Sequence, residues 1–271
     1  MRLALPTYLA DMAVCQLYSE RNSRVWRRPY VITVSRCERI DNSCSFASHD
    51  PTVPFFREYS QSMALGLSSP WLQFTMNLQG KAVNPLVLTG DGMNEEEFIR
   101  YNTENKHMMA VRNLHLTKMV LLYIFGELEA ADYSRQVWEE GTGAEGTHFM
   151  IYFIVLFSGL TCLGLARRYP KKRRHYLPPV RRYIKKMEKL VKDGGVNATL
   201  ILRFLRAEKL ALNGDLPDVK KAFDETISLA GRTGFRLIKA LACERMGNYM
   251  LERREPLLAA DYMQQAYFQV R

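Results

Sequence analysis

One uncharged stretch decides how the rest of the chain is interpreted: Phe149-Met-Ile-Tyr-Phe-Ile-Val-Leu-Phe-Ser-Gly-Leu-Thr-Cys-Leu-Gly-Leu-Ala166, followed at once by Arg167-Arg-Tyr-Pro-Lys-Lys-Arg-Arg174. Its eighteen residues reach the lower limit for a membrane-spanning helix, and a basic flank is typical of the cytoplasmic side of a span. The other interpretation is a helix buried inside a helical protein. Five small or polar residues dilute the apolar run: Ser158, Gly159, Thr161, Cys162 and Gly164. Because the segments on both sides are amphipathic and need a buried neighbour, the sequence favours the core helix.

Positive charge is concentrated directly after this stretch. The 271-residue chain has a formal charge of +10, and residues 167–192 hold twelve Lys and Arg against the single acid Glu188, which gives that segment a charge of +11. The rest of the chain is therefore close to neutral, at −1. Expectations about nucleic acid, anionic lipid or an acidic partner are confined to this segment.

The end of the basic segment has the pattern of an amphipathic helix. Apolar residues from Val180 to Val191 recur at helical spacing, and lysines and arginines take the opposite face. Such a face binds a phosphate backbone, anionic lipid or an acidic partner, or is simply the solvated outer side of a helical hairpin, which the regular stripe favours. The candidate patch for an anion or partner consists of Arg167, Arg168, Lys171, Lys172, Arg173, Arg174, Arg181, Arg182, Lys185, Lys186, Lys189 and Lys192.

Other sequence signals argue against an enzyme. The chain has no P-loop, protein-kinase, HExxH, GxSxG or histidine phosphoacceptor motif, so we expect no catalytic residue, cofactor or metal. Its five scattered cysteines form no CxxC pair, which indicates free thiols in a reducing compartment. The N-terminus is a poor signal peptide, so we expect a cytoplasmic protein, with a single-pass membrane protein as the alternative.

The chain before residue 54 divides into two segments. Residues 1–21 keep apolar positions at helical spacing and predict an N-terminal helix. Residues 22–53 show no period and are rich in Ser, Asn, Asp and Pro, so we expect a poorly ordered insertion. The remaining residues, 54–271, are expected to form one helical-repeat domain.

Helical spacing returns after residue 54. Ser68-Ser-Pro70 interrupts it, which predicts two short helices over 55–67 and 71–80 packed as a hairpin. A loop rich in Gly and Pro follows at 84–92, and Asn94 is expected to cap a helix that begins with Glu95-Glu-Glu97. The basic segment is expected to be a loop as far as Pro179. After this segment, Asn197 is expected to cap a further helix. The other predicted helices cover 106–125, 128–138, 149–166, 180–192, 217 onward, 235–251 and 257–270.

Two turns share a sequence pattern. Gly126-Glu-Leu-Glu-Ala-Ala131 and Gly214-Asp-Leu-Pro-Asp-Val219 begin 88 residues apart. With a central turn near Pro170 and a last turn near Arg254, they indicate a two-helix unit of about forty to forty-four residues. This spacing predicts an all-α fold, a TPR-like helical-repeat solenoid of antiparallel helix hairpins.

Several stretches together resemble a known family: Asn84-Pro to Thr89-Gly-Asp-Gly92, Leu121 to Ala131, Ala166-Arg-Arg to Val180-Arg-Arg-Tyr-Ile-Lys-Lys186, and Leu202 to Ala211. Over about three quarters of the chain, the sequence resembles the tetratricopeptide-like region of multidomain hybrid sensor kinases (serine/threonine and histidine) that also contain an AAA-type ATPase. The resemblance implies a non-catalytic interaction or regulatory module of a signal-transduction kinase, with kinase or ATPase modules as partners. Val219 and Thr226 stand where such repeats have small alanines, which questions tight packing of that hairpin.

Overall fold

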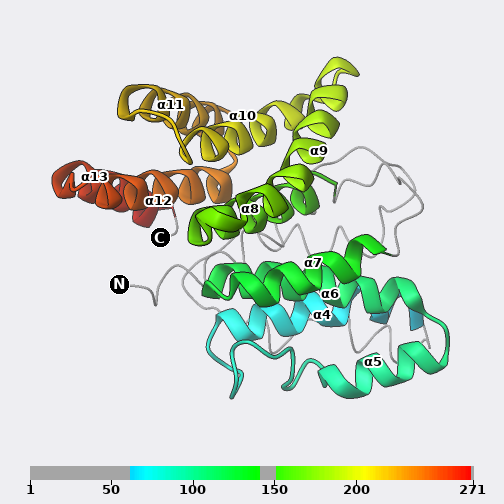
Figure 1. The fold of residues 1–271 in the computed structure, drawn as a ribbon. Coiled ribbons are helices and arrows are strands. Elements are labelled where there is room, and N and C mark those ends of the chain that lie inside the picture. The colour runs from blue at the N-terminus through cyan, green and yellow to red at the C-terminus, as the bar shows by residue number, and fades with distance from the viewer. Residues whose placement is uncertain (1–61, 141–150, 270–271) are drawn as a thin grey trace. The chain divides into compact units, whose positions relative to one another are not determined.

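The computed structural model describes residues 62–140 and 151–269, and most of these residues are helical. They form ten α-helices, α4 to α13, and one 3₁₀ turn, η2, with no strand in these two ranges (Figure 1). The all-α prediction is therefore confirmed for this part of the chain. The expected helix over 1–21 and the expected insertion over 22–53 lie outside the described residues. The chain divides into two compact units, Met1–Thr147 and His148–Arg271, so a division falls inside the range expected to be one domain.

Helix α6 is the centre of the first unit, since the other three described helices of the unit pack against it. Its core side chains include Leu114 and Met119, both fully buried. Gly126 ends the helix with a left-handed φ of 83°, and its amide donates to the Leu122 and Tyr123 carbonyls, as the predicted turn requires. The four helices are α4 Ser62–Leu78, α5 Glu95–Glu104, α6 Met108–Phe125 and α7 Leu128–Glu140.

Helix α4 corrects one sequence prediction, because it runs without a break where a hairpin was expected at Ser68-Ser-Pro70. A proline inside a helix has no N–H to donate to the carbonyl four residues earlier, here Gly66. Asn113 on α6 replaces that donor: its Nδ2 donates to the Gly66 and Leu67 carbonyls, at 3.3 Å and 2.9 Å. A side chain 43 residues further along the chain therefore keeps α4 continuous through Pro70.

The second unit is a run of six α-helices in which each helix packs on the next. Helix α8 also packs on α10. The turn η2, Pro170–Lys172, separates α8 from α9, close to the predicted turn at Pro170. The six helices are α8 Ile151–Arg168, α9 Arg173–Lys192, α10 Val196–Leu210, α11 Leu216–Thr233, α12 Arg236–Glu252 and α13 Pro256–Gln269.

Helix α8 is the apolar stretch around which the sequence was interpreted. Val155, Leu156 and Leu160 are at most 2% exposed. Gly159 lies so close to α10 that a Cβ atom added to it would meet Leu205 Cδ2 at 2.5 Å. Among the described helices, α8 alone is long and apolar enough to cross a membrane, a test that the buried core helix of a soluble protein also passes.

Two predictions at the basic segment are wrong. The expected loop over 167–179 is mostly helical, because α8 continues to Arg168 and α9 already begins at Arg173. Pro178 and Pro179 lie inside α9, where the carbonyls that they leave without a donor belong to the exposed residues Arg174 and His175, so water can hydrogen-bond to them. Asn197 is not a helix cap: α10 begins at Val196, and Gly195 occupies the cap position.

Candidate partner-binding face of helix α9

Helix α9 presents two opposite faces. Val180, Tyr183, Ile184 and Met187 are at most 9% exposed, and the helix packs on α8 and α10. This confirms the predicted apolar stripe. The opposite face carries most of the cations of the basic segment, so α9 exposes a strongly basic surface of the second unit.

The twelve predicted cations fall into four groups. Arg167 and Arg173 are half-buried and bind the protein itself: Arg167 Nη2 lies 3.2 Å from Glu208 Oε2, and Arg173 donates to the Ala166 carbonyl at 3.0 Å and to Asn213 Oδ1 at 2.6 Å. Lys172 lies over the Tyr169 ring, with Nζ 5.7 Å from its centroid. Arg168 and Arg182 are exposed and have further interactions. The other seven form no ion pair within the described chain: Lys171, Arg174, Arg181, Lys185, Lys186, Lys189 and Lys192.

Five of these seven cations share one side of α9. They follow one another at intervals of seven, four, four and three residues, which places them on one helix face, and all five are exposed. We call this set the α9 row; it consists of Arg174, Arg181, Lys185, Lys189 and Lys192. At 1.5 Å per residue the row extends for about 27 Å. It offers a straight line of positive charges and hydrogen-bond donors to an anionic partner.

The acid of the basic segment does not neutralise this row. Glu188 Oε1 accepts a hydrogen bond from Arg206 Nη2 of α10 at 2.7 Å. The charge of Glu188 is therefore balanced by a cation from another helix. None of the neighbouring lysines of the described α9 forms an ion pair with Glu188.

A buried carboxylate in the second unit was missed by the sequence analysis. Glu208 on α10 is 1% exposed and is bound from two sides: Arg245 Nε of α12 donates at 2.7 Å, and Arg167 of α8 completes the group. Burial alone would raise the pKa of Glu208, but the guanidinium groups of Arg245 and Arg167 hold the pKa below its ordinary value. The carboxylate stays ionised and joins α8, α10 and α12. Helical spacing gave a weak signal, since Glu208 lies between the apolar positions Leu205 and Ala211.

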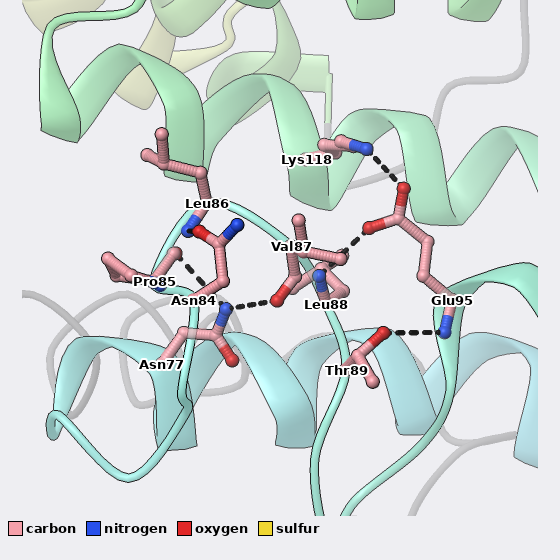
Figure 2. A network of polar contacts seen from close by, with 9 residues as sticks. All are labelled: Asn77, Asn84, Pro85, Leu86, Val87, Leu88, Thr89, Glu95 and Lys118. Atoms are coloured by element: carbon pink, nitrogen blue, oxygen red, sulfur yellow. Dashed lines mark hydrogen bonds and ion pairs between the residues drawn. The ribbon is translucent and has the colours of Figure 1, made fainter.

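The loop between α4 and α5 is held by a second polar network, in the first unit (Figure 2). Asn77 Nδ2 donates to the Pro85 and Val87 carbonyls at 3.1 Å and 2.7 Å. Gln73 Oε1 accepts from the Gly92 amide at 2.9 Å. Both side chains are almost fully buried, so helix α4 supplies the hydrogen-bond partners that the irregular backbone of the loop needs.

Glu95 completes this network from the start of α5. Asn94 caps that helix as predicted, with Oδ1 accepting from the Glu97 amide at 3.1 Å. Glu95 was expected to be a first-turn acid favoured by the helix dipole, but it is 7% exposed. Its Oε2 accepts from the Leu88 amide at 2.8 Å and its Oε1 pairs with Lys118 of α6 (Figure 2). These bonds hold the loop over 84–92 in place.

His115 lies close to this network on α6. Its ring is packed edge-on against Tyr133 of α7, with 6.3 Å between centroids. Burial lowers the pKa of His115, and the positive charge of Lys118 lowers it further, while Glu95 acts in the opposite direction. The imidazole is therefore stabilised in its neutral form. His107 was expected to be an ordinary helix residue, but it occupies the cap position before the same helix, which begins at Met108.

Comparison of the chain with protein-family models, with curated proteins and with solved structures found no match.

Proposed function

We propose that the second unit is a TPR-like helical-repeat solenoid, and that the chain is a non-catalytic interaction or regulatory module of a signal-transduction kinase. The observation that carries the fold part is the position of Glu208. It accepts hydrogen bonds from Arg167 of α8 and from Arg245 of α12, so one carboxylate links the first helices of three successive hairpins. Such contacts between equivalent helices of neighbouring units are what stacking in a solenoid requires.

The second helices of these hairpins are linked in a similar way. Tyr262 of α13 donates its hydroxyl to Asp224 Oδ1 of α11 at 2.6 Å. Burial raises the pKa of Tyr262 to about 12, and the bond to Asp224 raises it as well, so the hydroxyl keeps its proton. Within one hairpin, Phe204 of α10 meets Phe223 of α11 edge-on. Contacts within and between hairpins thus support a stacked arrangement.

The spacing of the helices supports the same proposal. The first helices begin at residues 151, 196 and 236, and the second helices at 173, 216 and 256. The intervals are 45 and 40 residues in one set and 43 and 40 in the other, close to the predicted unit. Val219 and Thr226, which replace the expected alanines, are both fully buried in the second unit.

The proposed partners are the modules that accompany such repeats in the family that the sequence resembles, an AAA-type ATPase and a histidine kinase. Helical repeats offer extended surfaces that bind other proteins without catalysing a reaction. Biolayer interferometry of the full chain against each purified module tests the proposal. We expect saturable binding to one of them with Kd on the order of 1 µM, and a change in that module's ATP turnover. Absence of binding at concentrations on the order of 100 µM would overturn the partner assignment.

We further propose that the protein is cytoplasmic and that α8 is a core helix. The support is its close packing: Gly159 leaves room for Leu205, and Arg167 at its end reaches a buried carboxylate. Cell fractionation tests this, and we expect the chain in the soluble fraction as one monodisperse species without detergent. Recovery only in a membrane pellet that resists carbonate extraction would instead assign residues 149–166 to a single-pass anchor.

A further inference from the structure

The two units differ in charge. The described residues of the first unit hold six Lys and Arg against ten Asp and Glu, a net charge of −4. Those of the second hold twenty-three Lys and Arg against eleven Asp and Glu, a net charge of +12, of which residues 167–192 supply +11. An anionic surface would therefore attract the second unit through α9 and repel the first.

The α9 row gives this attraction a definite shape. Its five cations lie along the outer side of a single helix, and all are exposed without an ion pair in the described chain. Lys171 precedes the row, and Lys186 lies on its flank, likewise without an ion pair. A plane laid against the helix touches the whole row at once.

The composition of the exposed face of α9 also favours a lipid surface over a protein or a single-stranded nucleic acid. Protein interfaces are centred on buried aromatic or apolar anchors, and single strands stack on exposed aromatic rings. None of the large apolar side chains found exposed in the described chain lies on α9. Tyr183 is directed into the core instead. The row offers charge alone, which is sufficient for lipid headgroups.

We propose that the α9 row docks this protein on anionic lipid bilayers, as a peripheral and purely electrostatic attachment. The apolar face of α9 is buried in the second unit, so α9 cannot insert into the hydrocarbon layer. The attachment is therefore reversible and falls steeply with salt, because exposed charges are screened over a few ångströms at high ionic strength. This inference is independent of the solenoid proposal, since it depends only on α9 and its exposed cations.

Vesicle co-sedimentation of the full chain tests it, with neutral phosphatidylcholine vesicles beside vesicles that contain about one third phosphatidylserine. The row variant is Lys185→Glu, Lys189→Glu and Lys192→Glu. The matched control reverses three exposed cations outside the row, Lys209→Glu, Lys221→Glu and Arg232→Glu, with the same change in net charge. We expect wild type to bind the anionic vesicles alone, the row variant to lose about 100-fold or more in binding, and the control to lose far less.

Several results would overturn the proposal. These are no binding of wild type to anionic vesicles at low salt, equal loss in the row variant and its control, or binding that added salt leaves unchanged. Tighter row-dependent binding to duplex DNA or to polyglutamate than to the vesicles would assign the row to nucleic acid or to an acidic protein. Circular dichroism checks that both variants are folded. If the Glu variant unfolds, Arg181→Gln, Lys185→Gln and Lys189→Gln remove charge from the same row without reversing it.

Discussion

Glu95 in the first unit and Glu208 in the second are both buried carboxylates on helices, but they stabilise different kinds of structure. Glu95 accepts from the Leu88 amide and pairs with Lys118, so it supports an irregular loop. Glu208 accepts from Arg167 and Arg245, so it supports the alignment of three helices. The difference shows two roles of a buried carboxylate in this protein. Glu95 provides a hydrogen-bond acceptor for the backbone of a loop, and Glu208 fixes the alignment of neighbouring helices.

The two sites also differ in what remains when the acid is removed. Without Glu95, one backbone amide and only one charged group, Lys118, lose a partner. Without Glu208, two arginines that are 18% and 21% exposed lose the same counter-charge. Breaking a buried pair from one side is costly because it leaves unpaired charge in the protein interior. The comparison therefore predicts a larger and more widespread effect at Glu208.

The largest effect is expected for Glu208→Ala. The variant removes the buried carboxylate that both Arg167 and Arg245 bind, so we expect a loss of about 3–5 kcal/mol in the free energy of unfolding. Urea unfolding gives this number, and hydrogen exchange gives its location. Exchange should rise in α8, α10 and α12 and stay unchanged in α4 to α7.

The matched control for this variant is Glu225→Ala, which removes an exposed partner of Arg203. Both side chains of that pair are about half exposed, so the loss should stay below about 1 kcal/mol. Equal losses in the two variants would show that Glu208 contributes no more than a surface ion pair. Increased exchange confined to α10 would separate Glu208 from the alignment of the three helices.

Low pH should reduce the stability of the second unit by protonating the Glu208 carboxylate. The folded pKa of Glu208 is held below its ordinary value, so its contribution is complete at neutral pH and is lost as the pH falls through the folded pKa. When the pH is lowered below about 4.5, we expect the urea concentration at the unfolding midpoint of wild type to decrease. It should decrease less in Glu208→Gln, because the amide has no carboxylate to protonate. Identical pH profiles would remove Glu208 from the acid response.

A smaller and local effect is expected for Glu95→Ala. The Leu88 amide and Lys118 lose their acceptor, which should cost about 1–3 kcal/mol, less than at Glu208. Hydrogen exchange at Leu88 should increase, while α8 to α13 keep their protection. The control is Glu96→Ala, because that neighbour is exposed and no hydrogen bond or ion pair is recorded for it. Faster exchange throughout the second unit would contradict the assignment of Glu95 to the loop.

The same contrast explains what could be predicted from the sequence. Apolar spacing and left-handed glycine caps are local, so most helices and the turn at Gly126 were predicted correctly. Pro70 was wrongly predicted to break the helix, because the donor that replaces its missing N–H, Asn113, lies on another helix. Glu208 was missed because its two arginines are 41 and 37 residues away. The basic segment was identified from its number of Lys and Arg residues. Which of these residues bind other groups of the protein depends on tertiary contacts.

Asn113→Ala tests this dependence on a distant donor and should cost about 1–3 kcal/mol in the free energy of unfolding. The change removes the donor for the Gly66 and Leu67 carbonyls and the acceptor for Trp71 Nε1. We expect faster hydrogen exchange in α4 around Pro70. The second variant, Pro70→Ala, restores the helical N–H, so the two changes combined should cost less than Asn113→Ala alone. If the free-energy changes of Asn113→Ala and Pro70→Ala simply add in the double variant, Asn113 does not compensate for the missing N–H of Pro70.

The smallest effect is expected for the cations that meet no carboxylate. Arg167 and Lys185 belong to the same basic segment, but only Arg167 reaches a buried acid. Replacing Lys185 and Lys189 with Ala should therefore change the melting temperature by no more than about 2 °C, because exposed charges contribute little to folding. Arg167→Ala should lower it clearly more, since Glu208 then keeps only Arg245. Calorimetry of the two variants measures the difference. A drop in the lysine variant as large as that of Arg167→Ala would mean that the α9 row is held by contacts within the protein, and the row would then not be free to bind a partner.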